Sequence, residues 1–550
     1  DEVKDELYKD NTTVMLVTFK EAISSDATMN TVQHLRDITD KHCKISGMTA
    51  TLLDTRDLSN SEVAIYVVIA VVLCLIVLEI ALDSYVAPIL LLANIGIAIL
   101  YNMGTNIFLG EISYITKAIS AVLQLGVTMD FAIFLYHSYQ AELKNTTDRN
   151  QAMSIAISKT FTSVLGSSLT TIAGFLALCS MNLTLGKDIG IVMAKGVLFG
   201  VISVVTILPS LILMFDKAIQ KTKHKELLPK FTTISEFNIK HYKAIIVIFL
   251  IALPIALYGY NNTKVYYKLD SSLPETLDSI SANNTLKDKF GLVSQEMILI
   301  NKDTPNDEIN EMLDKIEELD GVDFTLSYSK LSELGIPEEM LPEDLLSIFQ
   351  SDKYQMILIN SKYEIATDEL NNQIAKINEI VKQYDSNAKV VGEGPLMKDL
   401  VEISDHDFNS VNTVSIGIIF VIMMFVLKSI SLPVLLVIAI EFAIFINMGI
   451  PYYTNTTIPF IASIVIGTIQ LGATIDYAIL MTTRYKRERS RGADRKASVT
   501  TALATSIPSI LVSALGFFAA TFGVAVYSEI DIISLLCVSI FDLELEHIQK

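Results

Sequence analysis

Two aspartates lie inside long apolar stretches of this 550-residue chain, where an ionisable side chain is unfavourable. Asp130 falls within the run 113–136, and Asp476 falls within the run 459–483. A charged side chain at the centre of a bilayer costs roughly 2.5–3.5 kcal/mol on insertion scales, and such residues usually mark ion or proton pathways. We therefore interpret the pair as a proton or cation relay, with the proton as the ion we expect. The alternative is a pair of buried aspartates that only form hydrogen bonds with neighbouring helices.

The residues around the two aspartates suit this interpretation. Gly126 and Gly472 lie one turn before them, and a missing side chain there lets another helix approach closely. Tyr477 directly follows one aspartate and can offer its phenol to a carboxylate. The corresponding residue in the other stretch is Phe131, which has no hydroxyl. Any role for a tyrosine in the relay therefore depends on one residue.

Three further polar residues are candidates for the same network. His137 follows Asp130 by two helical turns on the same face, where it can pass a proton toward the cytoplasm, although a histidine at a helix end is often only interfacial. Glu441 lies within another apolar run, where it either joins the network or faces a lumen. Thr171 is a weaker candidate, because hydroxyls inside a span usually bond to their own helix.

The aspartates occupy equivalent places in an internal repeat with an offset of 345–346 residues. The stretch QLGVTMDFAI at 124–133 matches QLGATIDYAI at 470–479. Further matches at this offset are Pro88 with Pro433, 102–104 with 447–449, and Ser167 with Ser513. Two halves with the same orientation predict a pseudo-two-fold axis along the membrane normal. The two carboxyl groups are then expected to face each other near that axis.

The composition is that of a membrane protein. Apolar residues make up 51% of the chain and charged residues only 19%, whereas a soluble domain carries about 25% charged residues. This excludes a soluble enzyme and a disordered chain. The formal net charge of −19 also argues against a nucleic-acid partner, which needs a basic surface.

The apolar runs predict a polytopic α-helical membrane protein. A spanning helix needs roughly 17–25 predominantly apolar residues. Ten runs qualify: 62–82, 85–103, 113–136, 161–181, 190–215, 242–260, 411–427, 431–450, 459–483 and 507–526. A further apolar run at 530–541 is too short to cross and ends in a polar tail.

Two segments, 1–61 and 262–409, are polar and carry strand and helix patterns. The second contains two strand–helix–strand units, which is the ferredoxin-like α+β pattern. The first matches one such unit, with strands expected at 14–19 and 44–52 around a helix near 29–42. We expect both segments to be ferredoxin-like outer domains, one in each repeat.

Orientation follows from the basic residues of the loops. The loops 216–243 and 484–496 carry seven lysines and arginines each, whereas the short opposite loops near 104–112 and 451–458 carry none. By the positive-inside rule the basic loops are cytoplasmic and the polar domains extracytoplasmic, in the cell membrane. Segment 262–409 holds 30 acidic and 13 basic residues, which we interpret as a solubilising surface rather than an acidic binding face.

The repeat also predicts a domain organisation. It consists of 1–61 as the second half of a first outer domain, 62–215 as the spans of the first repeat, 216–241 as a basic linker, 242–260 as the first span of the second repeat, 262–409 as the second outer domain, and 411–541 as the remaining spans. The counterpart of 242–260 falls before residue 1, and the counterpart of 190–215 would extend to 561. We therefore expect the intact architecture to have twelve spans, with the first span and most of the last missing here.

No pattern for enzymatic chemistry is present. The sequence has no Walker A motif, no cysteine and histidine spacing typical of zinc, and no G-x-S-x-G elbow. We expect a protein that is not an enzyme, with no cofactor and no metal, whose energy source is the proton gradient.

Taken together, the paired repeats with outer domains resemble the resistance-nodulation-cell division (RND) superfamily. The stretches GVTMDFAIFLYHSY at 126–139 and GATIDYAILMTTRYKRER at 472–489 resemble the paired helices of its MMPL branch, which exports lipids and hydrophobic compounds. The resemblance covers essentially the whole chain. It implies a proton-driven antiporter in which Asp130, Asp476 and Tyr477 take up protons. Phe131, in place of a second tyrosine, departs from the family pattern.

The resemblance also bears on partners. It implies a lipid or another hydrophobic small molecule as substrate and the membrane as surroundings, with a monomer and a trimer both left open. Two alternatives remain within the wider relatives. One is an accessory unit of protein export of the SecDF type, and the other is a sterol-sensing-like receptor that binds lipid without pumping.

Overall fold

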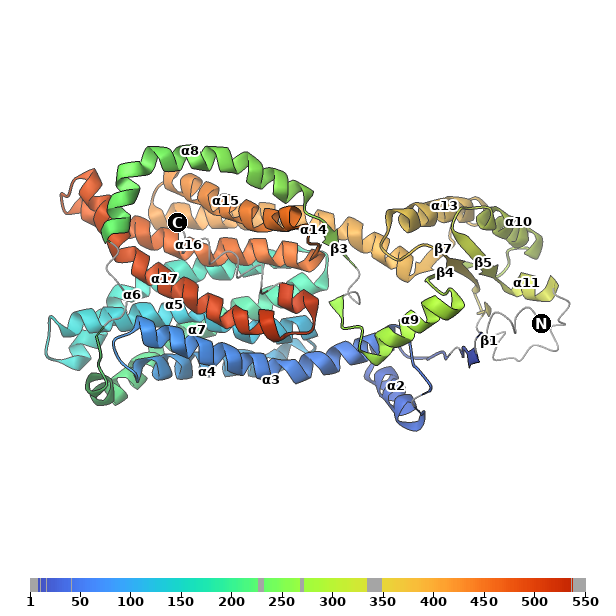
Figure 1. Ribbon diagram of the computed structural model, residues 1–550, viewed down its shortest axis with the longest axis horizontal. Helices are drawn as coiled ribbons and strands as arrows, with labels where there is room; N and C mark the ends of the chain where they lie inside the picture. Colours follow the sequence, from blue (N-terminus) through green and yellow to red (C-terminus); the bar gives the residue numbers. More distant parts are fainter. Residues whose placement is uncertain are drawn as a thin grey trace. The chain divides into compact units, whose positions relative to one another are not determined.

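The computed structural model describes residues 8–9, 11–15, 17–40, 42–225, 232–267, 272–333, 349–535 and 537. Within them, ten helices are long and apolar enough to cross a membrane, as the hydropathy predicts. They are α3 (Met48–Ala81), α4 (Ala87–Gly104), α5 (Tyr114–Leu143), α6 (Arg149–Ala177), α7 (Thr184–Lys221), α8 (Thr232–Asn262), α14 (Glu393–Leu427), α15 (Ser431–Thr454), α16 (Phe460–Ser490) and α17 (Arg495–Tyr527) (Figure 1). The protein is therefore a polytopic helical membrane protein.

The chain forms two compact units, each made of two stretches of sequence. One unit, which we call the outer unit, contains residues 1–56 and 266–404, and the other, the membrane unit, contains 57–265 and 405–550. The long helices α3 and α14 each begin in the outer unit and continue in the membrane unit.

In the membrane unit, α5 and α16 are the most enclosed helices. The apolar window of α5 is 94% buried and that of α16 is 72% buried, whereas that of α8 is only 11% buried. Helix α5 packs against α4, α6, α7 and α17, and α16 packs against α6, α15 and α17. The two helices that carry the aspartates therefore lie inside the bundle, while α8 presents its apolar side chains outward.

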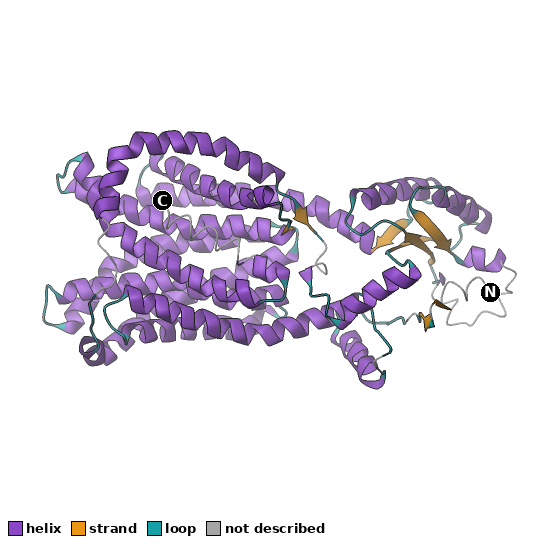
Figure 2. Cartoon of the chain, in the orientation of Figure 1, coloured by secondary structure: helices purple, strands orange, loops and turns teal. Residues whose placement is uncertain are grey.

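The outer unit contains a four-stranded antiparallel sheet (Figure 2). Its strands are β4 (Ser294–Asn301), β5 (Val322–Leu326), β6 (Tyr354–Ser361) and β7 (Lys389–Gly392), in the order β5-β6-β4-β7. Each of the two crossovers passes through a helix, α10 (Asn306–Glu317) and α13 (Asp368–Tyr384). This is the ferredoxin-like topology that the sequence predicts for 262–409.

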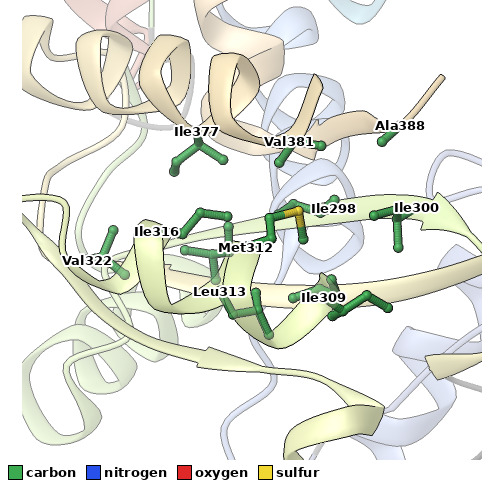
Figure 3. Packing of buried hydrophobic residues seen from close by; sticks show 12 residues of the cluster. Ile298, Ile300, Ile309, Met312, Leu313, Ile316, Val322, Ile377, Val381 and Ala388 are labelled. Atoms are coloured by element: carbon green, nitrogen blue, oxygen red, sulfur yellow. The ribbon is translucent and has the colours of Figure 1, made fainter. Parts of the chain in front are cut away.

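Strand alternation explains how this domain is held together. In β4 every second side chain is buried, so Ile298 and Ile300 point to the same face. Figure 3 shows Met312 of α10 and Ile377 of α13 packed over that face. The same cluster contains Ile309, Leu313, Ile316, Val322, Ile357, Ile359, Val381 and Ala388. Both helices therefore cover one face of the sheet.

The expected strands of the first polar segment are wrong. Among the described residues, 14–19 and 44–52 form no strand; this part contains only the short β1 (Tyr8–Lys9) and β2 (Thr12–Thr13) and the helix α2 (Asp26–Ile38). Helix α3 already begins at Met48, directly after Gly47 at φ +108°. Ala50 and Leu53, three residues apart, pack together against α2. Helical spacing buries this pair against α2, which accounts for the helix at a place where the sequence suggested a strand.

Some predicted segments fall partly outside the described residues. These are residues 1–7, 10, 16 and 41 of the first polar segment, 226–231 of the basic linker, 268–271 and 334–348 of the second polar segment, and most of the stretch after 535. The described parts of the linker are largely helical, because α7 extends to Lys221 and α8 begins at Thr232.

Candidate functional site

Asp130 on α5 and Asp476 on α16 are both buried, with exposed fractions of 8% and 6%. The phenol of Tyr477 donates a hydrogen bond to Asp130 Oδ2 at 3.1 Å. The tyrosine that follows one aspartate in the sequence thus contacts the aspartate of the other repeat. The two carboxyl groups are close enough for the charge of Asp130 to act on Asp476. The structure therefore brings together the three residues that the sequence singles out.

Asp476 has its own contacts from the first repeat. Thr170 of α6 places its hydroxyl 3.3 Å from Asp476 Oδ1 and also 2.6 Å from the carbonyl oxygen of Ser167. Ser167 lies beside Asp476 as well, and its repeat counterpart Ser513 of α17 lies beside Asp130. Each carboxyl group is thus lined by hydroxyl side chains from the opposite repeat, which can exchange hydrogen bonds with it when it gains or loses a proton.

Glycines allow the helices to approach around these carboxyl groups. A Cβ atom on Gly126 of α5 would lie 2.4 Å from the ring of Phe517 on α17, and one on Gly516 would lie 2.1 Å from Met129 Cε. Gly472 of α16 faces α6 less tightly, since a Cβ there would lie 3.7 Å from Thr171 Cα. On the α6 side, however, a Cβ on Gly174 would lie 3.2 Å from Gly472 Cα. Glycines therefore permit the close packing of α5 on α17 and of α16 on α6.

Of the remaining predicted residues, Thr171 also lies beside Asp476, whereas His137 and Glu441 do not contact the carboxyl pair in the described hydrogen bonds. Thr171 donates to the carbonyl oxygens of Ser167 at 3.2 Å and Gly472 at 3.3 Å, so it also joins α6 to the backbone of α16. The side chain of His137 is exposed, two turns beyond Asp130. Glu441 of α15 is half-buried and lies within electrostatic reach of Tyr260 on α8.

Two features of the site escape sequence reasoning. Thr170 and Thr171 are neighbours on one helix, and only the observed rotation of α6 shows that both side chains lie beside Asp476. Ser167 and Ser513 occupy matching positions in the repeat, which could have marked them as candidates. The repeat does not show that each serine lies beside the aspartate of the opposite repeat.

Comparison with known proteins places the chain in a family. The sequence profile of the MMPL family matches residues 8–234 and 315–538. The chain belongs to the MMPL family. This confirms the predicted relation to MMPL-type members of the RND superfamily and accounts for the tandem repeat.

Individual relatives match over shorter stretches. The membrane protein ActII-3 of Streptomyces coelicolor is 32% identical over 27% of this chain and 22% of its own length. MmpL12 of Mycobacterium tuberculosis, named as a probable transport protein, is 25% identical over 30% of this chain and 15% of its own length. The chain thus spans less than two thirds of the length of either relative.

A solved structure shares the fold. SecDF of Thermus thermophilus, described as a translocon-associated membrane protein, superposes with a TM-score of 0.59 over 88% of this chain and 60% of its own chain, at 11% sequence identity. At this identity the likeness shows a common fold of membrane repeats with outer domains, and it carries no statement about activity.

Proposed function

We propose that this chain forms part of a proton-driven transporter that exports lipids or other hydrophobic compounds across the cell membrane. The observation that carries the proposal is the hydrogen bond from Tyr477 to Asp130, which joins the two repeats at a buried pair of carboxyl groups. Membership of the MMPL family and the match to a protein named as a probable transport protein support a transporter.

The chemistry of the pair supports proton coupling. Two carboxylates that lie close together in a low-dielectric interior repel each other, so the pair favours states in which at least one is protonated. A change in protonation therefore changes how α5 and α16 attract each other at the centre of the bundle. Moving one proton down 100 mV releases about 2.3 kcal/mol, which is the free energy available to drive the helix movement.

The direction of transport rests on the loops. Seven basic residues between 216 and 243 and seven between 484 and 496 place these loops in the cytoplasm by the positive-inside rule. The ferredoxin-like domain is then extracytoplasmic, and protons enter from that side while substrate leaves toward it. Hydrophobic substrates enter sideways from the bilayer, and the outer domains guide their exit, since clefts between domains are usual ligand sites.

A deletion strain tests this function against protein export, which the shared fold with SecDF keeps as a second candidate. The strain is scored for its lipid profile, its sensitivity to lipophilic compounds, and the amount of secreted protein. The proposal expects altered lipids and raised sensitivity with normal secretion, both restored by the native gene. A loss of secretion with an unchanged lipid profile would contradict it.

A cross-link tests whether the outer domains lie on the path. Ser46 donates a hydrogen bond to Asn283, and Lys44 Nζ lies 2.9 Å from Ser281 Oγ, so the two stretches of the outer unit meet here. We expect a short cross-linker between cysteines introduced at Ser46 and Asn283 to stop export, in a Cys43→Ser background because Cys43 is exposed. Export that continues at the rate of the reduced protein would show that these segments do not gate the path.

A further inference from the structure

Two buried carboxylates outside the central pair make the same contact at equivalent places in the two repeats. Asp407 of α14 accepts hydrogen bonds from the backbone nitrogens of Asn182, through Oδ1 at 2.8 Å, and Leu183, through Oδ2 at 2.9 Å. Glu62 of α3 accepts from the backbone nitrogen of Glu529, through Oε1 at 2.7 Å, and from Ser528 Oγ, through Oε2 at 2.8 Å.

These positions are related by the repeat. Glu62 and Asp407 are 345 residues apart, and the pairs 182–183 and 528–529 are 346 residues apart. In each case the acceptor belongs to one repeat and the donors belong to the other. The exposed fraction of Asp407 is 0% and that of Glu62 is 4%, so the contacts are shielded from solvent, where hydrogen bonds to a charged group are strong.

Both carboxylates stand where a helix of the outer unit enters the membrane unit. The boundary between the units falls at 56–57 in α3 and at 404–405 in α14. Glu62 and Asp407 follow it within two helical turns. Helices α3 and α14, which run from one unit into the other, are therefore each hydrogen-bonded to the opposite repeat shortly after they enter the membrane unit.

One route from these contacts leads through α7 to the proton site. Leu183, the N-cap of α7, provides no side-chain cap of its own, and Asp407 of the other repeat accepts hydrogen bonds from the backbone N–H groups of Leu183 and Asn182, where α7 begins. Further along, α7 meets α5 closely: Gln124 Nε2 donates to the carbonyl oxygen of Gly196 at 3.0 Å, and a Cβ on Gly200 would lie 2.1 Å from Thr128 Cγ2. Thr128 lies two residues before Asp130.

A second route leads through α17. Ser528, held by Glu62, is the C-cap of α17. On this helix Gly516 packs on Met129 and Phe517 packs on Gly126, so α17 contacts α5 within the turn that directly precedes Asp130. In such close packing, a shift of α5 cannot leave α7 and α17 unmoved.

We infer that Glu62 and Asp407 are a matched pair of positioning residues, which transmit a change in protonation at the central aspartates to the outer-unit segments of α3 and α14. The inference rests on the proposed function, because it assumes that the central pair titrates during transport. It goes beyond that function by naming the connections through which the two repeats act on the helices of the outer unit.

Hydrogen exchange measured by mass spectrometry tests this in the full-length protein at one fixed pH. Asp130→Asn mimics the protonated state, and its effect is read on peptides covering 48–56 and 393–404. We expect a difference of about fivefold or more in their exchange rates, as for an allosteric coupling of about 1 kcal/mol. In the Glu62→Ala, Asp407→Ala background this difference should fall to less than about twofold. Asp405→Ala, an exposed acid on the same helix, is the matched control and should leave the response intact.

The outcomes separate positioning from simple helix capping. If the two carboxylates only cap helices, the double variant Glu62→Ala, Asp407→Ala would raise the exchange rate in the first turns of α7 and after 528. The outer-unit segments would still respond to Asp130→Asn, and this result would overturn the inference. Should the double variant fold poorly, Glu62→Gln with Asp407→Asn retains part of the acceptors and should give an intermediate response. Because exchange is read without any substrate, a failure of export assays would contradict the proposed function and leave this test unaffected.

Discussion

The phenol of Tyr477 donates a hydrogen bond to Asp130, with 3.1 Å between the phenolic oxygen and Oδ2. The residue beside the aspartate of one repeat therefore contacts the aspartate of the other. The equivalent position in the first repeat is Phe131, which is fully buried and has no hydroxyl. The two repeats thus offer different hydrogen bonds to their carboxyl groups. Asp476 receives its contact from Thr170 instead.

Two threonines of α6, Thr170 and Thr160, separate a role at the carboxyl group from a role in packing. Thr170→Val removes the hydroxyl next to Asp476 and keeps the shape of the side chain. Hydrogen bonds to charged groups contribute about 1.5–3 kcal/mol, but this hydroxyl also contacts the carbonyl oxygen of Ser167. We therefore expect export to fall about tenfold or less.

Thr160→Val, on the same helix, is the control for that change. Its hydroxyl donates to the carbonyl oxygens of Ala156 at 2.8 Å and Ile157 at 3.3 Å, within its own helix, and we expect export within about twofold of the parent. Initial rates of substrate efflux from cells with equal amounts of each protein provide the comparison. Equal losses in both variants would show that the threonines act through packing.

The contact between α5 and α17 predicts a large difference between two glycine substitutions. At Gly126 a new Cβ would lie 2.4 Å from the Phe517 ring, whereas at Gly96 it would meet nothing within 4 Å. Overpacking of a filled interface costs about 1–3 kcal/mol. Gly126→Ala should therefore lower the melting temperature in detergent, and Gly96→Ala should leave it unchanged or raise it slightly. Equal melting temperatures would mean that α5 and α17 are not packed as described.

The outer domain should lose stability as the pH rises toward neutrality, because of Glu296. This residue is fully buried on β4, accepts a hydrogen bond from Ser294 Oγ at 2.5 Å, and lies against Gly394 in the first turn of α14. Burial raises the pKa of Glu296 from 4.5 to about 7. The folded state therefore binds the proton more tightly than the unfolded state between these two pH values.

The sign of the effect follows from this linkage. The contribution of Glu296 to the free energy of unfolding of the outer domain is complete below about pH 4.5 and is lost as the pH rises to about 7. At 1.36 kcal/mol per pKa unit the loss is roughly 3 kcal/mol. Glu296→Gln cannot titrate and should remove this dependence. This pH dependence is measured by hydrogen exchange of the β4 peptide, compared between parent and variant at each pH. Parallel pH profiles for the two proteins would contradict the prediction.

Much of the architecture could be predicted because it depends on local patterns. Hydropathy located ten spans, and the period-two pattern of strands such as 294–301 predicted the ferredoxin-like sheet of the second outer domain. The prediction of a strand at 44–52 was wrong, because a short apolar stretch is compatible with either a strand or a helix. The elements packed against it determine which of the two forms. Here α2 and Gly47 favour the helix.

The pairing of distant residues was harder to predict. The repeat indicated that Asp130 and Asp476 face each other, since symmetry carries long-range information. It could not show which hydroxyl side chains of α6 lie beside Asp476. It also gave no sign of Glu62 and Asp407, because their donors are mostly backbone nitrogens, which any sequence provides.

The most direct test of the central claim is proton flux measured in proteoliposomes. The full-length protein is reconstituted with a pH-sensitive dye inside and a fluorescent lipid analogue as the transport probe, under an imposed pH gradient. Asp130→Asn and Asp476→Asn keep the size of the side chain but cannot titrate. The account predicts that each variant reconstitutes as well as the parent and that each loses both proton flux and probe export. Export at the parental rate in either variant, with the gradient in place, would contradict it.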